Sequence, residues 1–433
     1  MSPAERRTIA VWGHYHGGNL GDETVVATMI LAIRSRQPDA RIIAISLAPE
    51  DTERRHGVAA FPISPSASTG GYAAGSPRPS PGIRAVPGLG ALRRVPGLRA
   101  LVRGARIAPT VVREVRFSFR AYRLLRGIDT LVVAGSGQLT DTWGPWHHPF
   151  AAWRWGRLAR IARTELILPS VGAGPIRKRT SAAFIRSVLA SAAYISLREA
   201  GAERVLREIG VTRQLPFCPD MGWAARLPDP PAPPEPGRRI RVGMNVMAHQ
   251  DPRYLPPADI RRYHAYVANV AALVARLLEQ KCDVVLFSSQ TRADTLVADD
   301  VSASLAQQGL DGHPRLSSQF GGIEETDDLL EALATFDYVV ASRFHTVLFA
   351  LALGIPTLVL AHHGKTTDLL AQLGQSSESF DIDAFEPKEL HDALTLLRAS
   401  DTPACREERR NSAMQQREAV EAQFDALFGK ESE

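Results

Sequence analysis

Three basic side chains follow two short apolar runs in the last third of the sequence. Arg343 and His345 come at the end of the run 337–342, and Lys365 comes shortly after the run 356–360. Each run has the length of one buried strand, and open α/β sheets bind ligands outside the carboxyl ends of their strands. At the start of a helix, backbone N–H groups and the helix dipole add to the charge of basic side chains. The pattern therefore predicts a site for an anion, and a substrate that carries phosphate or carboxylate.

A Gly-rich turn near the N-terminus is a second candidate for ligand binding. Residues 8–12 read as a short buried strand, and the glycines of 13–21 lead into a periodic apolar helix that ends near Arg36. Glycines permit a tight turn and a close approach of the backbone to a ligand, and Asn19 or Asp22 can cap the helix. The same glycines are also typical of a turn that has no role beyond folding.

Together the two motifs resemble a known family. Gly-Asn-Leu-Gly-Asp-Glu at 18–23, taken with Ser-Arg-Phe-His at 342–345, is similar to the signature of the polysaccharide pyruvyl transferases. Three further segments also resemble that family: a strand with a Gly-rich turn and an aspartate at 129–141, a strand ending in arginine and an acid at 195–199, and the pair Pro219-Asp220.

The resemblance is limited in extent and in detail. It covers residues 8–58, 127–226 and 238–375, and it fails across 59–126. Within the matched ranges three positions depart from the usual pattern: Gly135-Ser136-Gly137 replaces three glycines, Glu199 replaces an aspartate, and His362-His363 stands before Lys365 where an aromatic residue is common.

The resemblance implies transfer of a pyruvyl group from phosphoenolpyruvate to a sugar diol, which gives a cyclic ketal and phosphate. In such a reaction the methylene carbon of the enol ether is protonated, and an oxocarbenium forms at the neighbouring carbon. One sugar hydroxyl adds there, phosphate leaves, and a second hydroxyl closes the ketal. The site needs cations for the donor's two anionic groups, an acid for the carbon and a base for the hydroxyl. We expect phosphoenolpyruvate as co-substrate, and neither a metal nor a further cofactor.

The basic residues suit the donor side of this reaction. We expect Arg343 and Arg198 to hold the carboxylate and the phosphate through bidentate hydrogen bonds. Lys365 would add a point charge at the phosphate, and Ser342 belongs to the same donor-binding group. His345 is the expected general acid, because an imidazolium titrates near working pH and the neighbouring phosphate would raise its pKa.

The expected acceptor residues lie in the first half of the chain. Indoles stack on the apolar faces of sugars, and four of the six tryptophans fall within 143–155. We expect Trp153 and Trp155 to begin a helix and to be structural. The acceptor-binding candidates are Asn19, Asp141, Trp143 and Trp146, with Asp22 as a further contact or catalytic base.

Several of these residues have a purely structural alternative. A histidine at a strand end often makes only a structural hydrogen bond, and acids near a helix start are common caps. The alternatives are such a hydrogen bond for His345, an ion pair of Arg198 with Glu199 or Glu203, and helix capping by Asp22 or Asp141.

Length and composition indicate an ordinary globular protein. The chain has 433 residues, of which 45% are hydrophobic and 22% charged, so two domains are expected. The three cysteines, Cys218, Cys282 and Cys405, have neither metal-ligand spacing nor the density of a disulfide framework, which suggests a reducing compartment. No signal peptide and no apolar run of spanning length is apparent, so we expect a cytoplasmic protein.

The positive charge is concentrated in one segment. Residues 61–126 hold twelve arginines and one acid, Glu114, a net +11, whereas the whole chain carries +5. A low-complexity tract at 64–87 leads into apolar residues at helical spacing, 89–102, with arginines between them. Such a basic amphipathic segment is expected to dock on an anionic membrane, where a lipid-linked acceptor resides. The alternative is a flap whose apolar stripe packs on its own domain. Nucleic-acid binding is disfavoured because the arginines lack interleaved aromatics before Phe117 and belong to an otherwise acidic protein.

Alternating strand and helix patterns predict two doubly wound Rossmann-like domains facing a cleft, similar to two-domain glycosyltransferases. The six prolines of 228–237 form a stiff linker between them. We expect an acceptor domain at 1–227 with an insertion at about 59–126, a linker at 228–238, a donor domain at 239–375, and C-terminal helices at 376–433, one of which braces the first domain.

Two other functions are consistent with this scaffold. A nucleotide-sugar-dependent glycosyltransferase would need an acid to hold the ribose, and Glu324 or Glu325 are candidates. A non-catalytic glycan- or lipid-binding protein is the other alternative, disfavoured because Arg198, Arg343 and His345 occur together. The sequence specifies neither the acceptor sugar nor its lipid carrier, the ketal stereochemistry or the oligomeric state.

Overall fold

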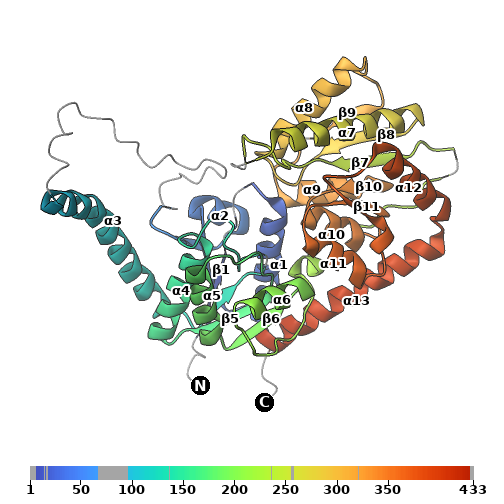
Figure 1. The fold of residues 1–433 in the computed structure, drawn as a ribbon. Helices are drawn as coiled ribbons and strands as arrows, with labels where there is room; N and C mark the ends of the chain where they lie inside the picture. Colours follow the sequence, from blue (N-terminus) through green and yellow to red (C-terminus); the bar gives the residue numbers. More distant parts are fainter. Residues whose placement is uncertain are drawn as a thin grey trace.

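Two parallel six-stranded sheets, each flanked by helices, form the two domains of the chain (Figure 1). This confirms the expected two-domain α/β architecture. The computed structural model describes residues 6–13, 15, 18–66, 96–135, 137–235, 237–254, 258–319 and 321–429, and for 96–108 it describes the helix without its side chains.

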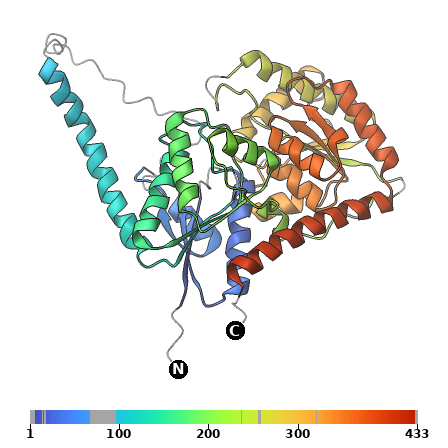
Figure 2. The same cartoon turned by 60° about the horizontal axis from the view of Figure 1, so that its bottom comes forward.

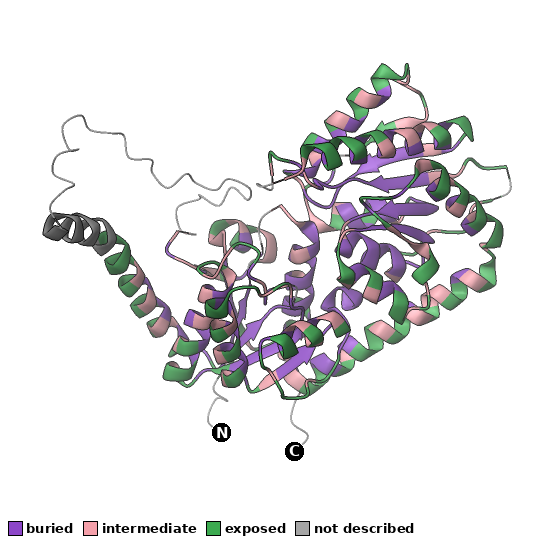
Figure 3. Cartoon of the chain, viewed as in Figure 1, coloured by how far each residue is buried: buried purple, intermediate pink, exposed green. Residues whose placement is uncertain are grey.

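Apart from the edge strand at 59–62, the strands of the first domain are short, mostly apolar runs that are largely buried, as is usual in parallel sheets (Figure 3). Its strands are β1 (Thr8–Trp12), β2 (Arg41–Ser46), β3 (Ala59–Pro62), β4 (Thr130–Val133), β5 (Glu165–Val171) and β6 (Tyr194–Leu197). Its helices are α1 (Leu20–Arg36), α2 (Pro49–His56), α3 (Pro96–Leu125), α4 (His148–Ala162), α5 (Arg179–Ser191), α6 (Ala200–Glu208) and the 3-10 turn η3 (Met221–Ala224).

The second domain repeats this arrangement. Its strands are β7 (Arg241–Asn245), β8 (Asp283–Phe287), β9 (Leu316–Ser318), β10 (Tyr338–Ala341), β11 (Thr357–Ala361) and β12 (Ser379–Asp381). Its helices are α7 (Ile260–Glu279), α8 (Asp294–Gln307), α9 (Thr326–Leu333), α10 (Phe344–Ala352), α11 (Gly364–Gln372), η4 (Ser376–Glu378) and α12 (Pro387–Ser400), followed by α13 (Pro403–Phe428).

The strand order places the sequence motifs at equivalent points of the two sheets. The first sheet has the order β3-β2-β1-β4-β5-β6, and the second, β12-β11-β10-β7-β8-β9, has the same order read from its other edge. The order reverses between β1 and β4 and between β7 and β10, and ligands bind at the carboxyl ends of strands beside such a reversal. The Gly-rich turn follows β1, and Arg343 and His345 follow β10.

The last helix, α13, crosses back from the second domain onto the first, as expected (Figures 1 and 2). Arg36 of α1 forms salt bridges with Glu421, at 2.8 Å, and Asp425, at 2.7 Å. The buried Gln423 donates to Ser170 Oγ at 3.0 Å and accepts from Tyr194 Oη at 3.0 Å. Helix α13 therefore ties the two domains together.

The range 59–126 is only partly an insertion. Strand β3 pairs with β2 as an edge of the first sheet, and the buried Phe117, Ala121 and Leu125 of α3 join the first domain's core. Residues 67–87 of the low-complexity tract and the apolar side chains of 89–102 lie outside the described side chains. No described helix is long and apolar enough to cross a membrane.

Candidate active site

A cavity of about 240 Å³ is lined by residues from both domains. Helix α1, the loop after β4 and the end of β6 line it from the first domain; the loop after β8 and the starts of α10 and α11 line it from the second. The domains are joined beside it, where Leu20 N donates to Ser289 O and Thr291 N donates to Gly18 O, each at 2.9 Å. The cavity thus lies at the meeting point of the motifs that the sequence singled out.

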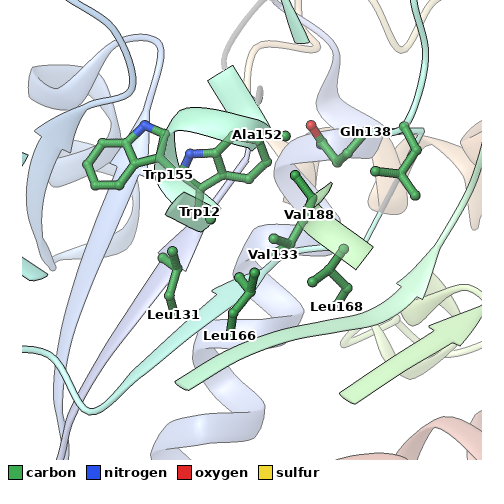
Figure 4. Close-up of a pocket in the computed structure, with 11 residues that line it drawn as sticks. Trp12, Leu131, Val133, Gln138, Ala152, Trp155, Leu166, Leu168 and Val188 are labelled. Carbon is green, nitrogen blue, oxygen red and sulfur yellow. The ribbon is translucent and has the colours of Figure 1, made fainter. Parts of the chain in front are cut away.

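Figure 4 shows a different space, in the core of the first domain. It holds only about 10 Å³ and is lined by apolar side chains such as Trp12, Leu131 and Trp155, with Gln138 at one side. That volume is roughly one water-sized sphere, too small for any substrate. We therefore take the cavity between the domains as the candidate site.

His345 lies in the first turn of α10, buried between two carboxylates of the first domain. Its Nδ1 is 4.0 Å from Asp22 Oδ1, and its Nε2 is 3.9 Å from Asp220 Oδ1. Asp22 lines the cavity, whereas Asp220 is buried beneath it. Gly21 is required for this approach, because a Cβ there would lie 2.3 Å from the Cβ of His345. The Nδ1 side of the ring is therefore the side next to Asp22, which lines the cavity.

Burial lowers the pKa of His345 below its usual value, although Asp220 and Asp22 act to raise it and Arg198 and Lys365 lower it further. The imidazole of the free protein is accordingly neutral near pH 7. A bound dianion would reverse this shift by stabilising the imidazolium. General-acid chemistry at His345 thus depends on an anionic ligand in the cavity.

Arg343 is the N-cap residue of α10, and a buried carboxylate fixes its guanidinium. Its Nε donates to Asp294 Oδ2 at 2.9 Å, and its Nη2 donates to Asp294 Oδ1. Asp294 is fully buried and also accepts from Ala248 N and Ser288 Oγ. Because a guanidinium has five N–H donors, three remain for a ligand after this pair forms. Asp294 therefore positions Arg343 without consuming its capacity to bind an anion.

Arg198 is more fully engaged than Arg343. Its Nε donates to Glu199 Oε2 at 2.9 Å, its Nη1 donates to Asp220, and its guanidinium lies 4.8 Å from the centre of the Phe344 ring. The structural alternative for this residue, an ion pair with Glu199, is therefore observed, whereas Glu203 pairs with Arg207. Arg198 still lines the cavity, and among the described residues its carboxylate partners bind Nε and Nη1 rather than Nη2.

Lys365, in the first turn of α11, is a half-buried cation in the cavity wall. Its Nζ lies 5.2 Å from the centre of the Phe344 ring. Within the described part of the chain, no carboxylate lies within salt-bridge distance of it. Burial and the nearby Arg198 lower its pKa, while Glu199, Asp22 and Asp220 raise it. An anionic ligand would relieve this electrostatic cost, so Lys365 is suited to a phosphate.

Asn19 and Asp22 reach the cavity from the start of α1. Asn19 is the N-cap residue: its side chain accepts from Gly21 N at 3.2 Å and donates to Asp22 Oδ2 at 2.7 Å. Trp143, which is 44% exposed, lines the cavity at the loop after β4. The structure thus brings together seven of the expected site residues: Asn19, Asp22, Trp143, Arg198, Arg343, His345 and Lys365.

Three expected site residues do not line the cavity. Ser342 is buried below it, where its backbone N–H donates to Asn245 Oδ1 at 3.4 Å. Asp141 accepts from the backbone N–H groups of residues 177 and 178, so its carboxylate holds a loop, close to the capping alternative. Trp146 packs at the surface, where its ring contacts Phe150 and Phe184.

Other residues of the site were not expected from the sequence. Gln138, Thr140, Thr142, His148, Ser289 and His362 also line the cavity. Burial lowers the pKa of His148 to about 4, so this side chain is a neutral hydrogen-bonding group. Among the described residues no cluster of His, Cys, Asp and Glu has the geometry to hold a metal ion.

Comparison with known sequences decides the family. The sequence model of the polysaccharide pyruvyl transferases matches residues 19–364, which is most of the chain. The protein belongs to the polysaccharide pyruvyl transferase family. No curated protein matches the sequence.

Solved structures share the fold of this pyruvyl transferase family member at low identity. A putative UDP-N-acetylglucosamine 2-epimerase from Listeria monocytogenes has a TM-score of 0.57 at 12% identity, with 98% of this chain and 96% of that chain covered. A UDP-GlcNAc 2-epimerase from Neisseria meningitidis has 0.53 at 10% identity, covering 97% and 99%. The lipopolysaccharide outer core galactosyltransferase WaaB has 0.50 at 9% identity, covering 97% and 99%. These similarities confirm the two-domain fold.

Two departures from the usual pyruvyl transferase pattern now have a structural setting. Glu199 keeps the negative charge of the usual aspartate and uses it to pair with Arg198. His362 lines the cavity, and its ring lies 4.2 Å from that of His363 between the centroids. Burial lowers the pKa of both histidines. They are therefore neutral near pH 7 and add no charge to the site.

The lowered pKa of His345 leads to a testable linkage. An anionic donor that raises the pKa of His345 must bind together with a proton. The affinity for the donor should therefore increase as the pH falls through the pKa of His345 in the complex, and should level off below the pKa of His345 in the free protein. Calorimetry in buffers of different ionisation enthalpy measures the protons taken up. We expect the wild type to take up more protons on binding than His345→Ala does. The variant is the control, because it still shows the protons taken up by the ligand's own phosphate. Equal uptake in both proteins would contradict this assignment.

Proposed function

We propose that this protein transfers the pyruvyl group of phosphoenolpyruvate to a sugar diol of a glycan or lipid-linked saccharide, forming a cyclic ketal and releasing phosphate. The observation that carries the proposal is the placement of His345 between Asp22 and Asp220 in a cavity whose wall also holds Arg343 and Lys365. This set supplies an acid, a base and cations in one space, as the reaction requires.

The donor binds to the cations of the second domain in this proposal. Lys365 and the three free N–H groups of Arg343 neutralise the phosphate and carboxylate, and Arg198 adds Nη2 from the first domain. Since these residues belong to different domains, donor binding favours closure of the cleft. No step is assigned to a metal or to a further cofactor.

In the proposed reaction the two ring nitrogens of His345 have different roles. His345 donates its Nδ1 proton to the methylene carbon of the donor, and the neighbouring carbon becomes an oxocarbenium. A sugar hydroxyl bonds to that carbon while Asp22 accepts its proton. The C–O bond to phosphate then breaks, and the second hydroxyl closes the ketal as its proton passes to the departing phosphate. Asp220 remains beside Nε2, where its charge stabilises the imidazolium before proton transfer.

The glycosyltransferase alternative has less support in the second domain. Glu325, one candidate for holding a ribose, is the N-cap residue of α9, where a capping box engages it. It also forms salt bridges with Arg54 and Arg55 of α2. Neither Glu324 nor Glu325 lines the cavity. Calorimetric titration of phosphoenolpyruvate against a panel of nucleotide sugars tests the choice: the proposal requires binding of the former.

Trp143 and Trp146 are expected to differ in their effect on the acceptor. Because Trp143 lines the cavity, Trp143→Ala should raise the KM for a saccharide acceptor by about tenfold. This change corresponds to the loss of one sugar–indole stack, which contributes about 1 kcal/mol or more. Trp146→Ala is the matched change in the same loop, and it should leave the KM for the acceptor within about twofold of the wild-type value. Steady-state phosphate release with varied acceptor measures both; equal effects would contradict the placement of Trp143.

A lipid-linked acceptor would bring the reaction to the inner, cytoplasmic face of a membrane. We propose that the basic range 61–126 makes this peripheral contact, since its net charge of +11 opposes that of anionic lipids.

A further inference from the structure

Helix α3 has two apolar faces, of which only one is packed. On the first, Phe117, Ala121 and Leu125 are buried against the first domain. The second carries Val111, Val115 and Phe119, which are 50%, 63% and 60% exposed. Residues four apart lie on the same side of a helix, so these three form one stripe. A soluble helix that packs on its own domain has no need of this second stripe.

Exposed arginines lie on the same part of the helix, with Arg116 and Arg123 beside the stripe and Arg113 further around the helix. Arg113, Arg116 and Arg123 are exposed, and the described residues place no carboxylate within salt-bridge distance of any of them. The only acid on the helix, Glu114, is taken by Arg154 of α4 at 2.7 Å. The positive charge of this face is therefore not neutralised within the described part of the molecule.

The helix also has the right placement for a surface contact. Figures 1 and 2 show α3 leaving the body of the first domain, and Figure 3 shows exposed residues along it. Its other end is fixed, because Phe117 contacts Phe61 and Trp155 with ring centroids 5.8 and 6.2 Å apart. The stripe is thus presented on a rigidly anchored arm.

We propose that this face of α3 binds an anionic lipid bilayer, with Val111, Val115 and Phe119 at the boundary between headgroups and acyl chains and the arginines on lipid phosphates. A basic helix with exposed apolar residues is the composition that lies in a membrane interface. A second copy of the helix is a poorer partner, since it would set arginine against arginine. The inference rests on the proposed function only for its purpose, which is to bring the cavity to a lipid-linked acceptor.

Co-sedimentation of the full chain with vesicles tests the proposal. Wild-type protein should bind vesicles containing phosphatidylglycerol, bind phosphatidylcholine vesicles at least tenfold more weakly, and lose affinity as salt rises. Val115→Asp/Phe119→Asp should lower binding by about tenfold or more. Leu396→Asp is the matched control, because Leu396 is 71% exposed on α12 of the other domain. It should bind as the wild type does.

The charge is tested separately. Replacing Arg113, Arg116 and Arg123 with glutamine should weaken binding by about 100-fold at low salt, at about 1 kcal/mol for each arginine, and should flatten the salt dependence. Equal binding of wild type and Val115→Asp/Phe119→Asp would overturn the proposal. A wild type that is dimeric and does not bind vesicles, together with a monomeric Val115→Asp/Phe119→Asp variant, would also overturn it. The stripe would then be an interface between two copies of the chain.

Catalysis distinguishes this inference from the proposed function. With a water-soluble saccharide acceptor, Val115→Asp/Phe119→Asp should release phosphate at the wild-type rate; with a lipid-linked acceptor in vesicles it should be slower. Absence of phosphate release in every protein would reject the proposed reaction and leave vesicle binding standing. Wild-type activity without vesicle binding would reject the membrane contact alone.

Discussion

Replacing His345 with alanine should slow turnover by about 10² to 10⁴, while the affinity for phosphoenolpyruvate stays within a few-fold of wild type. The ring is buried between Asp22 and Asp220, and its proposed task is to protonate carbon, whereas Arg343 and Lys365 bind the anions. Single-turnover phosphate release gives the rate, and calorimetric titration gives the donor affinity.

A control separates this loss from a general effect of removing histidine. His264→Ala changes an exposed histidine on α7, away from the cavity, and should have no effect on either quantity. Thermal unfolding of His345→Ala checks that the site remains folded. Turnover of His345→Ala at the wild-type rate would remove this residue from the mechanism.

Arg343→Lys should weaken donor binding by roughly 1 to 3 kcal/mol and also slow turnover. In the wild type one edge of the guanidinium pairs with Asp294 and the other is free, so a single side chain serves both the protein and the ligand. An ammonium keeps the charge but cannot present two such edges. It would either leave the buried Asp294 poorly paired or turn away from the donor.

Asp294→Asn tests the positioning role directly. The amide keeps the shape of the carboxylate but loses the charge that orients Arg343, so it should raise the dissociation constant for the donor although it lies outside the cavity wall. Proton uptake on binding should be unchanged, because His345 is untouched. A change in thermal stability with unchanged donor affinity would show that Asp294 is only structural.

The fold was predictable from the sequence because its strands are short, separate apolar runs. The strand expected at 8–12 has the bounds of β1, and the apolar runs at 337–342 and 356–360 contain or overlap β10 and β11. Strands β9 and β12 were missed because they have only three residues each, too few to show a period, and they form the sheet edges. The start of α3 at Pro96 was not expected, because this proline read as a break rather than as a first helical residue.

The site was predictable where a residue stands beside a strand end or a Gly-rich turn. Asp294 carries no such signal: it lies 49 positions before Arg343, and only the pairing of β7, β8 and β10 brings the two together. Trp143 and Trp146 belong to one loop, and the sequence could not show that only the first faces the cavity. The ion pairs of Arg198 also needed the structure, since Glu199 binds its Nε and Asp220 binds its Nη1.

Transfer of the pyruvyl group itself can be followed with a carbon label. Purified protein is incubated with phosphoenolpyruvate carrying carbon label in its pyruvyl group and with a library of glycan acceptors, and both free phosphate and label on the acceptor are followed. Phosphate and acceptor-bound label should appear in equal amounts. Mild acid should release the label as pyruvate, because acid hydrolyses a ketal. Transfer of a sugar from a nucleotide sugar by the same protein, with no label on any acceptor, would contradict it.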